Sequence, residues 1–70
     1  MNMNNAFQAM DEKQASKILG VSVQTLRNWR HLRKGPSYMK MGRAVRYNLD
    51  DLQDYMEKKR IDPEKRGWLR

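Results

Sequence analysis

The sequence has no cysteine and a single histidine, His31, among its 70 residues. Disulfides and thiolate metal sites are therefore excluded, and one histidine cannot hold a zinc ion by itself. No stretch approaches the ~20 apolar residues of a membrane-spanning helix. The polar segment 1–10 lacks a basic start followed by an apolar run, so no signal peptide is predicted. We therefore expect a cytoplasmic protein, and the absence of cysteine fits a reducing compartment.

Acidic residues are missing from residue 13 to residue 49. That run contains nine basic residues, namely Lys13, Lys17, Arg27, Arg30, Arg33, Lys34, Lys40, Arg43 and Arg46. The net charge of the chain is +7, while residues 1–12 carry −2 and residues 50–70 are neutral, so the run holds all the excess. Such a concentration of positive charge indicates a surface that binds a polyanion. The alternative is a basic surface that only keeps the protein soluble.

The length suits one small domain with a modest core. We expect a flexible N-terminus over residues 1–9, a folded domain over residues 10–61 and a charged tail over residues 62–70. The sequence contains no Gly-rich phosphate loop, metal cluster, paired carboxylates or nucleophile arrangement. It therefore predicts a protein that is not an enzyme and that needs no metal, cofactor or small-molecule substrate.

Two helices joined by a short turn are predicted in the first half of the chain. Asp11 can cap a first helix over residues 12–19, and Gly20 suits the left-handed conformation at its end. Ser22 can cap a second helix that runs from residue 23 to residue 32 or 33. Two helices with a short glycine-containing turn are typical of the helix-turn-helix arrangement.

Apolar and basic residues alternate on both sides of Gly42, which predicts a β-hairpin over residues 38–47. A two-residue tip, Gly42-Arg43, would mix polar and apolar side chains on each face, whereas a three-residue tip would separate them. We expect the three-residue tip. The opposed pairs would then be Met41 with Val45, Lys40 with Arg46, and Met39 with Tyr47. A bound phosphate would offset the repulsion between the two opposed basic residues.

A third helix is predicted to follow the hairpin directly. Asn48 can cap it, and the pair Asp62-Pro63 comes after its end. Its apolar stripe consists of Leu49, Leu52, Tyr55 and Met56. The order helix, turn, helix, hairpin, helix predicts a mainly α fold with a small β-hairpin.

The second helix is predicted to have two distinct faces. One face is assigned to the core together with Tyr47 and Met41, and it holds Val23, Leu26, Trp29 and Leu32. The opposite face is polar and free of acid, and it holds Gln24, Arg27, Asn28 and His31. Arginine reads guanine, and glutamine and asparagine read adenine, in the major groove of DNA.

Individual residues on that helix carry separate expectations. Arg27 is the foremost base contact, with a salt bridge to an acid on the third helix as the alternative. Thr25 and Arg30 lie at the margins, where phosphate contacts are expected. His31 is expected either to contact DNA at the groove edge or to face solvent.

In order and spacing, three segments resemble the excisionase/AlpA-type small helix-turn-helix family; they are QASKILGVSVQTLRNWR, KGPSYMKMGRAVRY and LDDLQDYMEKK. That family is related to the DNA-binding domains of MerR-type regulators. The resemblance covers about residues 10–60. It implies a winged helix-turn-helix fold, with the second helix in the major groove and the hairpin as the wing. The implied DNA contacts are Ser22, Gln24, Thr25, Arg27, Asn28 and Arg30 on the helix, and Lys40, Arg43 and Arg46 on the wing.

The resemblance further implies a sequence-specific DNA-binding protein of a phage or mobile element, in the cytoplasm of a bacterial or phage-infected cell. The leading role is an excisionase, or recombination directionality factor, that binds repeated sites cooperatively on double-stranded DNA and bends it for an integrase. The alternative is a transcriptional regulator of phage or mobile-element genes. RNA binding fits less well, because single-strand readers usually expose aromatic residues on a sheet.

A different class of function is a protein-interaction adaptor that acts through the tail. Trp68 and Leu69 stand near the end of that charged segment. They either fold back on the core or anchor a protein partner, because aromatic residues are enriched at binding hot spots.

Overall fold

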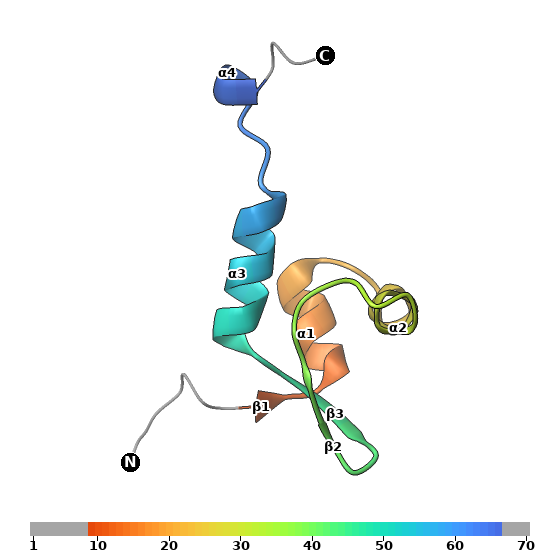
Figure 1. Cartoon of the computed structure of the whole chain (residues 1–70). Coiled ribbons are helices and arrows are strands. Elements are labelled where there is room, and N and C mark those ends of the chain that lie inside the picture. Colours follow the sequence, from red (N-terminus) through yellow and green to blue (C-terminus); the bar gives the residue numbers. More distant parts are fainter. Residues whose placement is uncertain (1–8, 67–70) are drawn as a thin grey trace, which may run out of the picture.

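The computed structural model describes residues 9–66, and Figure 1 shows their arrangement. The elements in chain order are β1 (Ala9–Met10), α1 (Glu12–Leu19), α2 (Val23–His31), β2 (Met39–Met41), β3 (Ala44–Asn48), α3 (Leu49–Lys59) and α4 (Pro63–Arg66). In Figure 1, α1 and α3 lie side by side, α2 is seen end-on and α4 lies beyond the end of α3. The predictions for residues 1–8, Trp68 and Leu69 fall outside the described residues.

The predicted helix starts are confirmed at α1, α2 and α3. In each case a side-chain oxygen accepts a hydrogen bond from the backbone N–H three residues later. The caps and their donor–acceptor distances are Asp11 at 2.9 Å, Ser22 at 3.0 Å and Asn48 at 3.0 Å. Gly20, with φ of 72°, ends α1 in the left-handed conformation predicted for it. Short polar side chains at these positions therefore fix where the helices begin.

The C-terminus of α2 differs from the prediction, because the helix ends at His31 and Leu32 is 61% exposed. The next residue, Arg33, has a left-handed φ of 61°. Its N–H donates to the carbonyl of Arg30 at 3.1 Å, and the N–H of Lys34 donates to the carbonyl of Trp29 at 2.8 Å. This pair of bonds is a Schellman motif, which turns the chain away before Leu32 can reach the core.

The sheet has three antiparallel strands in the order β1-β3-β2. β1 was not predicted, and it begins at Ala9, inside the segment expected to be a flexible N-terminus. It pairs with the end of β3, where Met10 lies opposite Tyr47. A two-residue strand has too few residues to show an alternating pattern, so only the pairing itself identifies it.

The predicted hairpin register is wrong by one residue. The observed pairs are Met39 with Arg46, Lys40 with Val45 and Met41 with Ala44, which leaves a two-residue tip. Gly42 has a positive φ of 63° and Arg43 does not, as in the type II′ turn that favours glycine at its first central position. Met41, expected in the core, is 53% exposed. Because the outer hairpin has no fully buried face, turn geometry sets its register.

The core receives one fully buried side chain from each main element. These side chains are Ala15 of α1, Leu26 of α2, Tyr47 of β3 and Leu52 of α3. Trp29 packs against this cluster, as predicted, and its ring centroid lies 5.5 Å from that of Tyr55. A buried contact at the centre of α2 holds that helix on the domain and leaves its polar face outward.

Candidate nucleic-acid interface

The polar face of α2 is exposed over its whole length. Gln24, Arg27, Asn28 and His31 are all exposed, at the spacing i, i+3, i+4, i+7 that the sequence predicted. Nε2 of Gln24 donates to Oδ1 of Asn28 at 3.0 Å. That bond leaves one amide hydrogen on the Gln24 nitrogen, the Gln24 carbonyl and both amide hydrogens of Asn28 available. The face therefore presents mixed donors and acceptors, which suits the base edges of the major groove.

Arg27 forms an ion pair with Glu12 at the start of α1. Both Nε and Nη2 of Arg27 donate to Oε2 of Glu12, at 3.1 and 2.6 Å. The Arg27 side chain is still 55% exposed. The sequence left open a salt bridge to an acid on the third helix, and the acid found is instead on the first.

Arg30 is held more deeply than its predicted place at the margin of the face. Its side chain is 17% exposed. Nη1 donates to the hydroxyl of Tyr47 at 2.9 Å, and Nη2 donates to Oε1 of Glu12 at 3.0 Å. Its guanidinium also lies over the ring of Tyr38, 5.7 Å from the centroid. These contacts fix Arg30 between the wing and α1, and its predicted DNA contact stays a prediction.

The two ion pairs shift the pKa values of all three charged groups. The Arg27 hydrogen bond is the main cause that lowers the pKa of Glu12, and it outweighs the opposing effect of burial. The bond to Glu12 raises the pKa of Arg27. Burial lowers the pKa of Arg30, but hydrogen bonds to Tyr47 and Glu12 outweigh burial and the net direction is upward. All three groups are therefore ionised at neutral pH.

Ser22 and Thr25 lie at the start of the face and are tied to each other. The Ser22 hydroxyl donates to the Thr25 hydroxyl at 2.9 Å, and it accepts the Thr25 backbone N–H at 3.0 Å. Both residues thus belong to the cap of α2. A helix N-terminus with polar side chains attracts anions, so the phosphate contact predicted for Thr25 has a physical basis and stays a prediction.

The wing places its basic residues differently from the prediction. In the observed register Lys40 and Arg46 project from opposite faces of the hairpin, because they are offset by one residue across the ladder. They therefore cannot share one phosphate as proposed from the sequence. Arg46 instead donates to the carbonyl of Val45 at 2.8 Å, while Lys40 and Arg43 are exposed.

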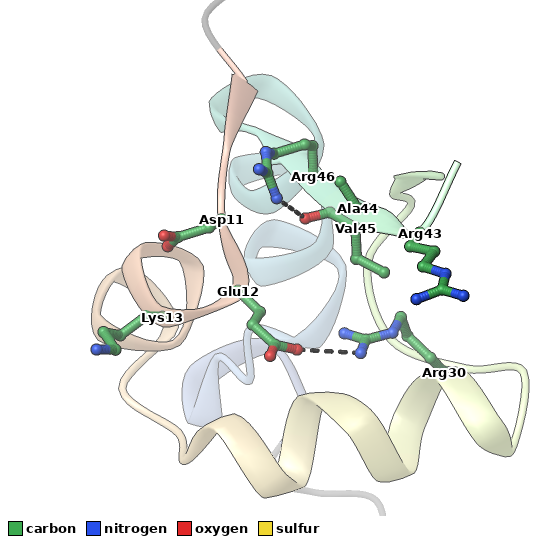
Figure 2. Close-up of a pocket in the computed structure, with 8 residues that line it drawn as sticks. All are labelled: Asp11, Glu12, Lys13, Arg30, Arg43, Ala44, Val45 and Arg46. Atoms are coloured by element: carbon green, nitrogen blue, oxygen red, sulfur yellow. Dashed lines mark hydrogen bonds and ion pairs between the residues drawn. The ribbon is translucent and has the colours of Figure 1, made fainter. Parts of the chain in front are cut away.

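A groove of about 550 Å³ separates the start of α1 from the wing (Figure 2). Four basic side chains line it, together with Asp11 and Glu12, and they are Lys13, Arg30, Arg43 and Arg46. Figure 2 shows the Arg43 side chain extending from the hairpin tip toward Arg30. The fold therefore brings two of the predicted wing residues, Arg43 and Arg46, to the same groove as Arg30 of α2.

A second groove, lined in part by basic side chains, lies beyond the end of α2. Its lining includes His31, Arg33 and Lys34, followed by the loop that leads to Tyr38. Gly35 in that loop has φ of 93°, and a Cβ there would lie 2.9 Å from the Trp29 ring. Close packing of this loop on Trp29 thus holds Arg33 and Lys34 beside His31, at the C-terminal end of the polar face.

No group of three His, Asp or Glu side chains in the described part of the chain lies close enough to hold a metal ion. Within residues 9–66, every helix is too short or too polar to cross a membrane.

A capped two-helix unit, an exposed acid-free face on its second helix and a basic hairpin define a winged helix-turn-helix protein, a class that binds DNA. The chain belongs to the helix-turn-helix domain family, because the model of that domain matches residues 9–60. That family includes AlpA- and excisionase-like proteins, so this part of the resemblance is confirmed, while the relation to MerR-type regulators stays a prediction. No curated protein matches the chain.

Sequence reasoning missed the part that Glu12 and Tyr47 play in this site. Glu12 was predicted only as part of the first helix, over residues 12–19, and Tyr47 only as core. The bond between Glu12 and Arg27 joins residues 15 positions apart on different helices. Helical periodicity relates residues within one helix and carries no signal for such a contact. The one available hint is that Glu12 is the last acid before the long acid-free run.

Proposed function

We propose that the protein is a non-enzymatic, sequence-specific DNA-binding protein of a phage or mobile element, which acts in the cytoplasm. The observation that carries this proposal is the exposed, acid-free face of α2 in a chain that belongs to the helix-turn-helix domain family. Gln24, Arg27 and Asn28 supply the base contacts in this proposal. Arg43 and Lys40 of the wing supply backbone contacts, which fix orientation without reading sequence.

The proposed role is that of an excisionase, or recombination directionality factor. α2 has nine residues, and only about four of its side chains face outward at suitable spacing. One such helix makes few base contacts, and each contributes a limited discrimination. Several copies on adjacent repeats multiply that discrimination, so cooperative self-association on DNA is part of the proposal. A separate integrase is the further partner.

The test is enrichment of genomic fragments from the source organism by the full chain, at roughly 150 mM salt, where purely electrostatic binding is weakened. Footprinting of the enriched fragments follows, with Arg27→Ala as the matched control. Protection of several direct repeats beside an integrase gene or attachment site supports the excisionase role. A single protected site over a promoter would instead indicate a transcriptional regulator.

Two further outcomes count against the proposal, the first against DNA recognition by α2 and the second against DNA binding as the biological role. No enrichment over the Arg27→Ala control would show that this face does not read DNA sequence. If deletion of residues 62–70 abolished the biological effect while DNA binding stayed intact, the adaptor that acts through the tail would be the better explanation.

A further inference from the structure

One carboxylate lies within the basic face of the molecule, where it would be expected to repel DNA. Glu12 has a side chain that is 23% exposed and lies between two arginines of α2. Its Oε2 accepts both hydrogen bonds from Arg27, and its Oε1 accepts one from Arg30. Two guanidinium groups and one carboxylate leave this cluster with a net positive charge, so it still attracts phosphate.

The geometry of the Arg27 contact leaves its outer edge free. A guanidinium carries five N–H donors, one on Nε and two on each Nη. Glu12 occupies the side edge, formed by Nε and Nη2. The end-on edge still has one N–H from each Nη, and that parallel pair matches the O6 and N7 acceptors of guanine. Glu12 therefore restrains the guanidinium plane without using the donors that read a base.

The restraint is anchored in the core through a chain of hydrogen bonds. Arg30 links Glu12 to the hydroxyl of Tyr47, and the Tyr47 side chain is 1% exposed. Arg27 is thus connected through Glu12 and Arg30 to the central strand β3 of the sheet. An arginine held in this way loses less rotamer freedom when it binds than one that is free in solvent.

We propose that Glu12 is a positioning residue for sequence specificity, which holds Arg27 so that its end-on edge meets a guanine in the major groove. This inference rests on the proposed function, since it requires that α2 reads DNA. The opposite role, in which Glu12 competes with DNA for Arg27, predicts the reverse change when Glu12 is replaced, and the two are separated below.

The experiment starts with selection of duplexes from a random DNA pool by the full wild-type chain, which supplies the target. Binding to the selected duplex and to a scrambled duplex of the same composition is then measured at roughly 150 mM salt. The variants are Glu12→Gln, Arg27→Ala and the double variant. Glu57→Gln is the matched control, because it removes the same charge from an exposed ion pair on α3.

We expect Glu12→Gln to lower the ratio of selected to scrambled affinity about tenfold, as for loss of one bidentate base contact. Glu57→Gln leaves that ratio within about twofold of wild type, as expected for a rim charge. Arg27→Ala lowers the ratio, and adding Glu12→Gln to it lowers the ratio no further, because both act on one contact. Repeated selection with Glu12→Gln loses preference at one base pair, the same one that Arg27→Ala loses.

Three results overturn the inference while the proposed function stands. The first is a higher ratio of selected to scrambled affinity for Glu12→Gln, which would make Glu12 an inhibitory competitor. The second is an unchanged ratio. The third is a loss of preference spread over all positions of the site, which would indicate a general structural role. A wild-type chain that selects no sequence, or an Arg27→Ala variant that keeps full preference, rejects the proposed function and this inference with it.

Folding of each variant is checked by its far-UV circular dichroism and thermal unfolding. If Glu12→Gln does not fold, Glu12→Asp gives the same test, because its side chain is one methylene shorter and cannot reach both arginines. It retains the negative charge, so the expected loss at one base pair then arises from geometry alone.

Discussion

The outward faces of α2 and α3 are both polar, yet they differ in how their charges are arranged. On α3 two ion pairs form between residues close in sequence, with Lys58 bonded to Asp54 at 3.1 Å and Arg60, the C-cap residue, bonded to Glu57 at 3.3 Å. On α2 the arginines reach back to Glu12 on another helix. A face whose charges pair with one another has few charged groups available to bind a ligand. The α2 face instead presents exposed hydrogen-bond donors, including the Arg27 guanidinium, and carries no acidic residue. The contrast assigns the first to solvent and the second to a polyanion.

The inward faces of the same two helices are equivalent, and this gives the largest expected effect. Leu26 of α2 and Leu52 of α3 are both fully buried. We expect Leu26→Ala and Leu52→Ala each to lower the free energy of unfolding by about 2–5 kcal/mol. Urea unfolding followed by circular dichroism measures both. A clear difference between the two losses would show that the helices do not contribute equally to the core.

The outward faces should respond very differently to loss of one basic residue. Arg27→Ala is expected to reduce the preference for the selected DNA by roughly tenfold to a hundredfold, the value of one bidentate base contact. Lys58→Ala removes the same charge from α3 and is expected to leave that preference unchanged. Fluorescence anisotropy with selected and scrambled duplexes measures both. Equal losses would mean that only net charge matters.

Arg33 allows stability and binding to be separated at the end of α2. Its φ of 61° is strained for a residue with a side chain. We expect Arg33→Gly to raise the free energy of unfolding by up to about 1 kcal/mol, because glycine adopts this φ without strain. We also expect it to weaken DNA binding, because a basic residue in the groove beyond α2 is lost. Urea unfolding and DNA titration of the same sample give the two values. A variant that is more stable and binds equally well would exclude Arg33 from the interface.

Acid should affect the cluster that links α1 and α2. Arg27 and Arg30 lower the pKa of Glu12, so its stabilising contribution is fully present above the unfolded-state pKa of about 4.3. That contribution is lost as the pH falls below this value through the lower folded-state pKa. We expect wild type to lose more unfolding free energy between pH 6 and pH 3 than Glu12→Gln does. Parallel curves for the two proteins would contradict this linkage.

The smallest effect is expected on the outward face of α3. Asp54→Asn breaks an exposed pair between residues one helical turn apart, with side chains 65% and 71% exposed. Such pairs contribute about 0.3–0.5 kcal/mol to the free energy of unfolding, and salt screens them. The loss should therefore shrink further between 50 mM and 500 mM salt. A larger loss would show that the α3 face has a partner within the molecule.

The elements predicted best from the sequence are those fixed by local chemistry. Asp11, Ser22 and Asn48 begin their helices because a short oxygen-bearing side chain satisfies a free N–H within three residues. The exposed face of α2 follows equally from helical spacing, since Leu26 determines which side is buried. These features depend on residues only a few positions apart in the chain, so the pattern of the sequence is enough to predict them.

The features that sequence reasoning missed depend on contacts between distant segments. The hairpin register was expected to follow from separation of polar and apolar faces, but Met41 is exposed and the Gly42 turn decides the pairing. The strand β1 exists only because β3 offers it an edge. The bond from Glu12 to Arg27 likewise requires the packing of α1 on α2. Local patterns indicate none of these partners.

The absence of any linker between β3 and α3 has a mechanical consequence. Asn48 is both the last residue of β3 and the cap of α3, so strand and helix are joined without a hinge. α3 extends about 16 Å from that point, at 1.5 Å per residue. Because Tyr47 of β3 and Leu52 of α3 are both buried in the same core cluster, strand and helix form one rigid unit that can move only together with the rest of the domain.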